Sequence, residues 1–162
     1  MGDNVVAGKA GDFTEADRQE FMRLVQEGGE VGNIVLARNI EAARRLVFLR
    51  DNKRLIGIAA LKVPQASYRK RIGTLSGAKI EEGMFPLELG YVFVVPGERN
   101  RGLSRRLVET TLDHSIRGGI FATSRADNTS MHRTLERFEF RAAGKPYAGR
   151  EQTIQLFVRE GH

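Results

Sequence analysis

The sequence predicts an α/β fold in which short strands alternate with helices around one sheet. Its 162 residues suit a single domain spanning residues 1–162, and a chain of this length can bury a sizeable core. Hydrophobic residues make up 41% of the chain and charged residues 28%, which excludes wholesale disorder. Short apolar runs alternate with amphipathic stretches, and this alternation is typical of a sheet that mixes hairpins with crossovers.

The first half of the chain predicts a strand, two helices and a β-hairpin. Thr14, followed by Asp17, is a typical helix N-cap. Gly28 and Gly29 end that helix, because glycine adopts the backbone conformation that closes helices. A turn at residues 51–53 joins two apolar runs, which is a hairpin signal. The expected elements are a strand at 5–7, helices at 14–28 and 32–43, and strands at 46–49 and 55–63.

The second half predicts further helices and strands in alternation. Pro64 and Pro86 bracket the least regular stretch, in which residues 67–71 open a short helix. Pro96 ends a strand, because proline cannot donate to a β-ladder. The expected elements after Pro86 are a strand at 88–95, a helix at 102–117, a strand at 120–123, a helix at 128–138, and closing strands at 140–143 and 153–159.

The composition excludes several classes of site. The chain has no cysteine, so disulfides, iron–sulfur clusters, cysteine zinc sites and thiol nucleophiles are excluded. The acidic and histidine residues have no metal-ligand spacing, so no metal is expected. Apolar stretches such as 55–61 are far shorter than the roughly 18 residues of a membrane span, and the N-terminus lacks a secretory signal pattern. We therefore expect a cytoplasmic protein with no membrane partner.

Positive charge is concentrated in the last third of the chain. The net charge is +6, and residues 99–162 carry 12 basic and 7 acidic groups. Eleven of these 12 cations are arginine, whose planar guanidinium can bond two phosphate oxygens at once. The excess indicates either a solvated arginine-rich surface or a phosphorylated small ligand. A nucleic-acid partner is disfavoured, because the sequence has no dense basic block and no RNP-type aromatic motif.

The segment from Tyr91 to Ser104 carries the main chemical signal. A strand runs into a short turn rich in arginine and glycine, and a helix begins directly after it. Unpaired backbone N–H groups and the helix dipole make such a helix start an anion site. Gly102 would let the backbone approach a phosphate, and Arg99 and Arg101 would add ionic donors. The alternative is an ordinary strand–turn–helix connection with solvent-facing arginines.

Two motifs stand out in residues 88–140. The first is Arg99-x-x-Gly102-x-Ser104, directly after a V-x-V-x-P-type strand. The second begins at Asn128, after a short strand, and continues through a helix into the sequence Phe138-Glu139-Phe140. Together they resemble the two signatures of the GNAT acyltransferases, (Q/R)-x-x-G-x-(G/A) and an asparagine followed by a helix with a GF-like end. The resemblance implies a mixed, mostly antiparallel sheet of about seven strands with about four helices, its central parallel strands splayed for acyl-CoA.

The resemblance also implies acetyl-CoA as the co-substrate. The strand before Pro96 would pair with the pantetheine arm through its backbone, and the arginine- and glycine-rich turn would hold the pyrophosphate. The asparagine of the second motif would contact the pantetheine arm. The implied cofactor-binding residues are Phe93, Val94, Val95, Arg99, Asn100, Arg101, Gly102, Leu103, Ser104 and Asn128. The charge excess of the last third would attract the polyanionic CoA.

The catalytic groups follow from the same resemblance only in part. Acyl transfer needs a base for the amine, donors for the thioester oxygen and a leaving thiolate. The family pattern implies Glu88 as the base, acting through water, and a backbone N–H near a strand bulge, placed at Val94, as the oxyanion donor. The usual acid is a tyrosine near the end of the last helix, but Leu135 occupies that position. Three alternatives stay open: water protonates the thiolate, Tyr91 or Tyr147 supplies the proton, or the protein binds CoA without transfer.

Several of these residues have a competing structural interpretation. Glu88 could be a surface carboxylate paired with an arginine, and Tyr147 an exposed aromatic between the closing strands. Glu139 stands where the family has glycine, which suggests a different helix C-cap. His132 is either a base near the acyl group or a partly exposed helix residue, and His114 lies at the far end of the preceding helix.

The acceptor pocket of the family lies between the first two helices and the stretch before the fourth strand, here residues 14–43 and 64–87. The expected substrate-contacting residues are Tyr68, Arg69 and Tyr91. The basic run at 69–71 would repel polycations, so a carboxylate-bearing amine suits it better, and a protein N-terminus is also open. If the run faces solvent, this inference fails.

The sequence therefore predicts an acetyl-CoA-dependent N-acetyltransferase that acetylates a primary amine of a small molecule or peptide by direct transfer. The alternatives are a non-catalytic CoA-binding or CoA-sensing module, which Leu135 favours, and a nucleic-acid-modifying relative. A homodimer is common in the family, and an exposed edge at residues 153–158 could pair with a partner.

Overall fold

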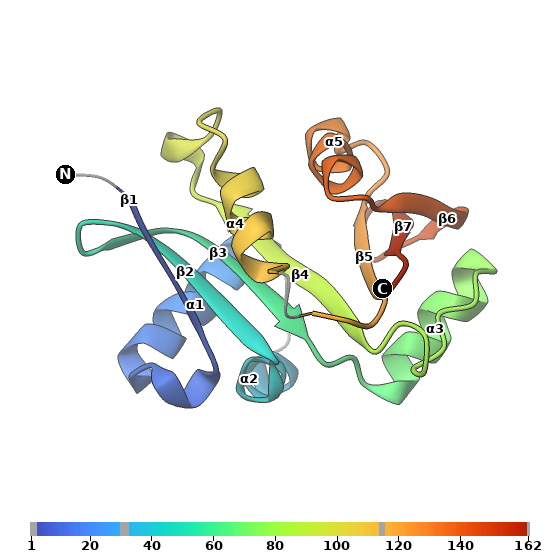
Figure 1. Ribbon diagram of the computed structural model, residues 1–162, viewed down its shortest axis with the longest axis horizontal. Coiled ribbons are helices and arrows are strands. Elements are labelled where there is room, and N and C mark those ends of the chain that lie inside the picture. The colour runs from blue at the N-terminus through green and yellow to red at the C-terminus, as the bar shows by residue number, and fades with distance from the viewer. Residues whose placement is uncertain (1–2, 30–32, 114–115, 162) are drawn as a thin grey trace. The chain divides into compact units, whose positions relative to one another are not determined.

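The computed structural model describes residues 3–29, 33–113 and 116–161. Within these ranges the chain forms seven strands, five α-helices and two 3-10 turns (Figure 1). In chain order they are β1 (Asp3–Gly8), η1 (Ala10–Asp12), α1 (Glu15–Glu27), α2 (Asn33–Ala42), β2 (Arg45–Asp51), β3 (Arg54–Lys62), α3 (Ala66–Ser76), β4 (Leu87–Val94), η2 (Pro96–Glu98), α4 (Leu103–Thr111), β5 (Ile120–Arg125), α5 (Thr129–Arg137), β6 (Arg141–Ala148) and β7 (Thr153–Arg159). None of the helices in these ranges is long and apolar enough to span a membrane.

The chain divides into two compact units, each built from two stretches of sequence. The first unit comprises Met1–Val63 and Leu89–Asp113, and the second comprises Pro64–Glu88 and His114–His162. The strand β4 is shared, because its first two residues belong to the second unit and the others to the first. The backbone therefore passes from one unit to the other three times.

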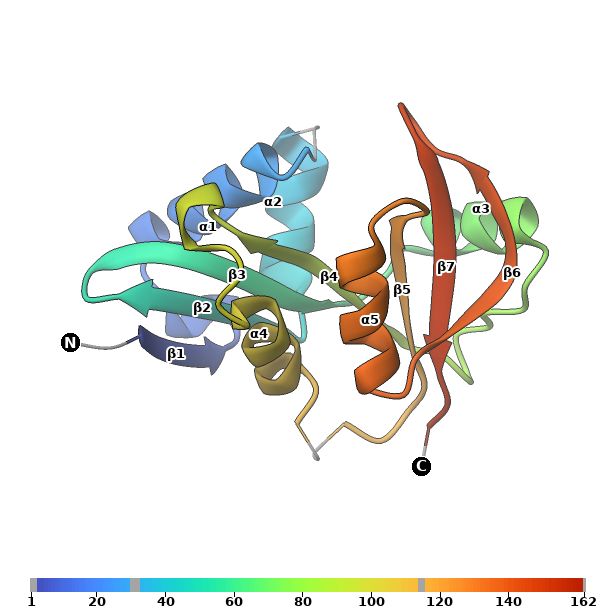
Figure 2. The same ribbon diagram turned by 90° about the horizontal axis from the view of Figure 1, so that it is seen from above.

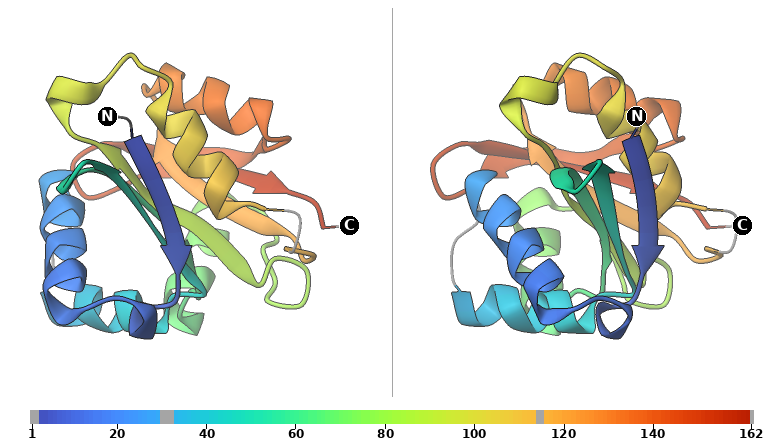
Figure 3. Two further views of the ribbon diagram at one scale, coloured as in Figure 1. Left: turned by 60° about the vertical axis from the view of Figure 1, so that its left-hand side comes forward. Right: turned by 90° about the vertical axis from the view of Figure 1, so that its left-hand side faces the viewer.

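The first unit is a four-stranded layer with helices on both faces. Its strands follow the order β1-β2-β3-β4, and β2 pairs antiparallel with both β1 and β3. The helices α1 and α2 pack from one face, and α4 packs on β2 and β3 from the other (Figure 3). Phe21, Ile40 and Leu107, one from each of these helices, are fully buried against the strands. Each side chain of this size stabilises the fold by roughly 1.5–3 kcal/mol through its burial.

Local sequence signals set the ends of these elements as predicted. The Thr14 hydroxyl accepts the N–H of Asp17 at 3.1 Å, and the Asp17 carboxylate accepts the N–H of Thr14 at 3.2 Å. This reciprocal capping box satisfies two donors that the first turn leaves unpaired. The helix ends at Gly28. In the β2–β3 hairpin, Asn52 has a φ of 56°, a left-handed conformation that asparagine tolerates better than most residues.

The second unit is a three-stranded antiparallel layer in the order β5-β7-β6. The helix α3 packs on β6 and β7, and α5 lies on the opposite face of the strands (Figure 2). Ile72 of α3 joins Phe121 of β5 and Leu156 of β7 in a buried apolar cluster. The helix begun at residues 67–71 thus runs on to Ser76, and its inner face closes this small core.

The predicted helix over 102–117 is wrong in its second half. The helix α4 ends at Thr111, and Leu112 leaves the helical region with φ −104° and ψ 46°. Arg45 stabilises this end: its guanidinium donates to the Thr111 carbonyl at 2.8 Å and pairs with Asp113 at 3.2 Å. These contacts come from β2, distant in sequence, so helical periodicity could not predict them. The prediction for His114 lies outside the described residues.

The end of α5 also differs from the prediction, which expected a new kind of cap because Glu139 replaces glycine. Glu139 instead adopts the left-handed conformation itself, with φ 72°. The N–H of Phe140 bonds to the Leu135 carbonyl, and the N–H of Glu139 bonds to the Glu136 carbonyl, both at 3.0 Å. This is the Schellman motif that glycine usually closes, built here with a non-glycine residue.

Candidate functional site

A buried carboxylate and two tyrosines form the chemical centre of the second unit. Glu88, at the start of β4, is only 2% exposed. The hydroxyl of Tyr68, on α3, donates a hydrogen bond to Glu88 Oε2 at 2.8 Å. Tyr68 and Tyr147 both pack on the apolar cluster of Ile72 and its neighbours. Glu88 is therefore a buried, hydrogen-bonded carboxylate, and the surface position considered from the sequence is wrong.

The two tyrosines keep their protons to unusually high pH. Burial raises the pKa of Tyr68 well above its ordinary value, the negative charge of Glu88 and the hydrogen bond to it raise it further, and a hydrogen bond with Thr123 acts in the opposite sense. Burial and the charge of Glu88 raise the pKa of Tyr147 to about 12, against a lowering effect from Arg71. Both phenols are thus neutral hydrogen-bond donors around neutral pH.

An irregularity in β6 brings Tyr147 to this cluster. The register of β6 on β7 shifts between Ala143 and Tyr147, and Gly144 lies inside the shift with a φ of 68°. A Cβ atom at Gly144 would stand 2.5 Å from the carbonyl oxygen of Ser76. Glycine is required there, because any side chain would collide with the end of α3. The predicted strand at 140–143 was therefore too short, since β6 continues through the bulge to Ala148.

Arg69, predicted as a substrate contact, binds the protein's own backbone. Its guanidinium donates to the carbonyls of Ile80, Phe85 and Pro86 at 2.7, 2.6 and 3.3 Å. The same group lies 5.4 Å from the ring centre of Phe121. Burial lowers the pKa of Arg69, and the charges of Glu82 and Glu88 counter that effect. These contacts fix the loop that leads into Glu88.

The first unit holds the predicted phosphate-binding turn. The residues Arg99, Asn100, Arg101 and Gly102 are all exposed. Asn100 and Gly102 adopt left-handed conformations, with φ 64° and 73°, and Gly102 is the N-cap of α4. The first N–H groups of α4 lack helical partners, and the helix dipole adds partial positive charge at this end. The turn therefore ends in an exposed helix N-terminus, and its binding of a phosphate stays a prediction.

The two arginines of this turn are held in different ways. Arg99 donates from Nε to the Val94 carbonyl at 2.9 Å, and its guanidinium carbon lies 5.4 Å from the ring centre of Phe93. Arg101 pairs with Glu98 and, at 2.9 Å, with Asp3 of β1. Each of these carboxylates has a second arginine: Arg54 lies 3.6 Å from Glu98, and Arg106 lies 4.0 Å from Asp3.

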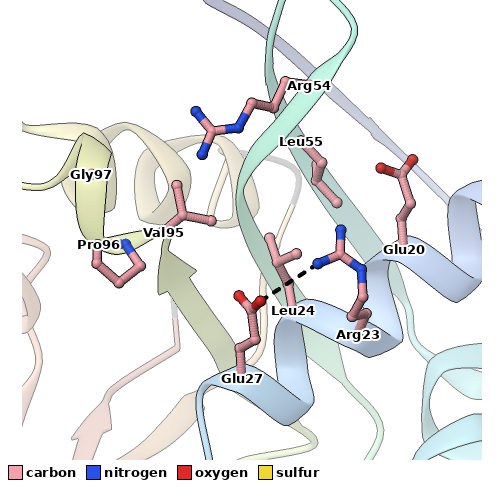
Figure 4. A pocket seen from close by; sticks show the side chains of 9 residues that line it. All are labelled: Glu20, Arg23, Leu24, Glu27, Arg54, Leu55, Val95, Pro96 and Gly97. Atoms are coloured by element: carbon pink, nitrogen blue, oxygen red, sulfur yellow. Dashed lines mark hydrogen bonds and ion pairs between the residues drawn. The ribbon is translucent and has the colours of Figure 1, made fainter.

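A pocket of about 270 Å³ lies between α1, β3 and η2 (Figure 4). Its walls carry charges of both signs, including Glu20, Glu27 and Arg54. Arg23 and Glu27, four residues apart on α1, form an ion pair at 3.5 Å. The two carboxylates of this pocket offset its two arginines, Arg23 and Arg54, so the pocket has no excess of positive charge for a phosphate.

Tyr91 breaks the regular geometry of β4. Its φ is 56°, so the strand irregularity lies three residues before Val94, where the sequence analysis placed the oxyanion donor. The Tyr91 ring packs edge-on to Phe21 at 6.3 Å, and Lys62 Nζ lies 4.3 Å from its centre. The N–H of Val95 bonds to the Ile56 carbonyl of β3 at 2.9 Å. Val94, the neighbouring residue, therefore turns its backbone polar groups away from β3.

The residues of the second motif lie around the start and core of α5. The Asn128 side chain accepts the N–H of Met131 at 3.1 Å, as an N-cap does. His132 Nε2 lies 3.0 Å from the Arg125 carbonyl, and its ring contacts Phe157. Leu135 is 0% exposed. The position of the family's usual tyrosine is thus part of the apolar core.

The described structure brings together Tyr68, Glu88 and Tyr147 in one unit, and it gathers the predicted cofactor-binding residues 93–104 in the other. The sequence analysis assigned Tyr68 to the substrate and missed its bond to Glu88. The two residues lie 20 positions apart in sequence. Their contact depends on how α3 folds back on β4, which no local pattern predicts.

A family comparison decides the classification. Residues 10–140 match the model of the acetyltransferase (GNAT) family. The chain belongs to this family. Members of this family are acetyltransferases, so the protein is an enzyme of this class. The resemblance that its two sequence motifs indicated is confirmed. No curated protein matches its sequence significantly.

Solved structures confirm that the GNAT acetyltransferase has the family fold, with seven strands and five helices in the described residues. An acyl-CoA N-acyltransferase from Pseudomonas aeruginosa matches with a TM-score of 0.68 at 15% identity, over 98% of this chain and 99% of that one. NAA60 from Arabidopsis thaliana, solved with acetyl-CoA, matches with a TM-score of 0.66 at 16% identity, over 97% and 99%. The putative acetyltransferase YncA from Salmonella typhimurium, also solved with acetyl-CoA, gives 0.65 at 15% identity, over 99% and 94%.

Proposed function

We propose that the protein transfers the acetyl group of acetyl-CoA directly to a primary amine of a small molecule or peptide, with Glu88 as the general base. One observation carries the proposal: Glu88 is buried and held by the Tyr68 hydroxyl at 2.8 Å at the position that the family pattern gives to the base. Two of the similar structures hold acetyl-CoA, which supports it as the acetyl donor.

In the proposed reaction, an ammonium group first loses a proton through a water molecule to the Glu88 carboxylate. The free amine attacks the thioester carbon and the new C–N bond forms; the nitrogen then gives up a second proton to solvent as the C–S bond breaks. CoA leaves as a thiolate and takes up a proton, so the overall reaction releases one proton. General-base assistance of this kind typically contributes about 10²–10⁴-fold to the rate.

Tyr147 is a weak candidate for the acid that protonates the thiolate. Its pKa is raised to about 12, whereas a free thiol has a pKa of about 8.5. Proton transfer from such a phenol to a thiolate is uphill, because the thiolate is the weaker base. Because neutral pH lies below the thiol pKa of about 8.5, the released thiolate takes a proton from the buffered solvent without an acidic side chain. We therefore propose that the solvent supplies this proton and that Tyr147 acts as a neutral hydrogen-bond donor beside Glu88.

For the donor, we propose that the pyrophosphate binds at the N-terminus of α4, with Arg99 to Ser104 around it. The left-handed Asn100 and Gly102 support this role, since they turn backbone N–H groups outward. The backbone of Phe93 to Val95 and the side chain of Asn128 remain proposed contacts of the pantetheine arm. A cytoplasmic location, a single domain over residues 1–162 and a homodimer remain predictions.

A second candidate function is CoA binding without transfer, which the buried Leu135 favours. Thermal unfolding with acetyl-CoA, CoA and ATP tests the shared binding step. A ligand at about 100 times its Kd adds roughly 2.7 kcal/mol of stability. We expect a shift with acetyl-CoA and CoA but not with ATP, and no shift with acetyl-CoA would refute both candidates.

Release of CoA thiol over a panel of amines then separates transfer from binding alone. We expect Glu88→Gln to lower kcat by about 10²-fold or more while KM changes little. Glu136→Gln, an exposed carboxylate on α5, is the matched control and should leave both constants unchanged. If Glu88→Gln keeps the wild-type kcat, Glu88 is not the base.

A further inference from the structure

The cation Arg71 stands beside the Tyr68–Glu88 pair. It is exposed on α3, and its guanidinium carbon lies 5.7 Å from the ring centre of Tyr68. Among the described residues it forms no ion pair with a carboxylate. Arg69, two positions earlier, is by contrast committed to three backbone carbonyls. Arg71 is therefore the arginine of this helix whose donors are available to a ligand.

The charges of Arg71 and Glu88 both affect the pKa of Tyr147. The charge of Glu88 raises the pKa of the Tyr147 phenol, and the charge of Arg71 lowers it. The phenol therefore lies within electrostatic reach of both groups. The Tyr68 hydroxyl donates a hydrogen bond to Glu88, and the Arg71 guanidinium lies over the Tyr68 ring. One aromatic side chain therefore contacts both the carboxylate and the cation.

We propose that the acceptor is a zwitterion of the amino-acid type, with its carboxylate bound by Arg71 and its amine delivered to Glu88. A guanidinium presents parallel N–H donors that match the two oxygens of a carboxylate. The stacking on Tyr68 restricts the Arg71 side chain, so less conformational freedom is lost on binding. This inference rests on the proposed function, because it identifies the substrate class of the same Glu88 site.

The arrangement also excludes other acceptors by charge. Lys70, next to Arg71, is exposed as well, so an acceptor with several positive groups would meet repulsion here. An amine with no carboxylate would gain nothing from Arg71. Selectivity for a carboxylate close to the amine is the property that separates this proposal from general amine acetylation.

The test compares L-amino acids with their own C-terminal amides, with acetyl-CoA as donor and CoA thiol as readout. We expect the wild-type protein to prefer the acid form by about tenfold or more in kcat/KM, the range that a charged hydrogen bond supplies. Arg71→Met should lower kcat/KM for the acid by about 10- to 100-fold and leave the amide within roughly twofold. Arg71→Lys should restore part of the loss, since it keeps the charge without the fork.

Lys70→Met is the matched control, because it removes a neighbouring exposed cation, and it should leave both substrates within roughly twofold of wild type. The proposal is overturned if the wild-type protein uses acid and amide equally, or if Arg71→Met weakens both to the same extent. If no amine of either set is acetylated, the proposed transfer fails. Calorimetric binding of the amino acids to the CoA-loaded protein then decides the role of Arg71. Weaker binding by Arg71→Met but not by Lys70→Met supports that role. No binding by the wild-type protein, or equal binding by the wild-type protein and Arg71→Met, refutes it.

Discussion

The hydrogen bond from Tyr68 to Glu88 should be one of the strongest single polar contacts in the second unit. Its acceptor is a carboxylate that is only 2% exposed, and the two oxygens stand 2.8 Å apart. A hydrogen bond to a charged group contributes roughly 1.5–3 kcal/mol. Tyr68→Phe should therefore lower the free energy of unfolding by about that amount. For a chain of this length, that corresponds to a drop of roughly 3–12 °C in Tm.

A double-mutant cycle isolates this contact from the rest of the Tyr68 ring. Tyr68→Phe, Glu88→Gln and the double variant are unfolded by urea near neutral pH and followed by circular dichroism. We expect a coupling energy of about 1.5–3 kcal/mol. Tyr147→Phe, combined with Glu88→Gln, is the control: among the described residues its hydroxyl has no hydrogen bond to Glu88, so its coupling should be smaller. A Tyr68–Glu88 coupling below about 0.5 kcal/mol would refute the reasoning.

Alkaline pH gives the same variant a second readout. The pKa of Tyr68 is raised in the folded protein, whereas a tyrosine in the unfolded chain has a pKa of about 10. The folded protein therefore keeps this proton to higher pH than the unfolded chain does. The resulting stabilisation is complete below about pH 10 and is lost as the pH rises through the folded pKa. The wild-type protein should therefore lose stability more steeply above about pH 10 than Tyr68→Phe does.

Two further predictions concern left-handed residues. Glu139→Gly should raise stability by about 1 kcal/mol, or roughly 2–4 °C in Tm, because glycine adopts φ 72° without strain; a thermal melt with unchanged or lower Tm would contradict the Schellman assignment. Gly102→Ala and Gly102→Glu should both lose about 1–2 kcal/mol of stability, since φ is 73° there and a Cβ meets nothing within 4 Å. Only Gly102→Glu should also weaken acetyl-CoA binding by about tenfold or more in calorimetry, and equal affinities in the two variants would argue against the phosphate-binding turn.

Most of the fold could be predicted from local signals. The capping box of Thr14, the glycines after α1 and the proline after β4 fixed element ends that the structure confirms. The family motifs carry the same kind of local information, and the family comparison bears them out. The errors in the elements occurred where distant contacts override the local pattern, as Arg45 does at the end of α4.

The candidate site could be predicted less completely, for a related reason. Glu88 was proposed as the base because the family pattern places a glutamate at the start of this strand, but its partner Tyr68 comes from a helix 20 residues away in sequence. Arg69 and Arg71 look equivalent in the sequence, yet the first binds backbone carbonyls and the second lies on the Tyr68 ring. A helix turns by about 100° per residue, so residues two apart point to opposite sides. Which side faces the carboxylate is a tertiary property.

The ion pairs of Arg101 have a consequence for how the protein responds to ionic strength. If Arg101 turns from Glu98 and Asp3 to a phosphate, each carboxylate still has its second arginine, Arg54 or Arg106. The protein thus supplies its own counterions: one anion replaces another on Arg101, and few ions need to leave from solution. Salt screens the ion pairs of Arg101 with the carboxylates and the ion pair of Arg101 with the phosphate to a similar extent. Acetyl-CoA affinity should therefore vary less with salt than an arginine-rich surface would suggest.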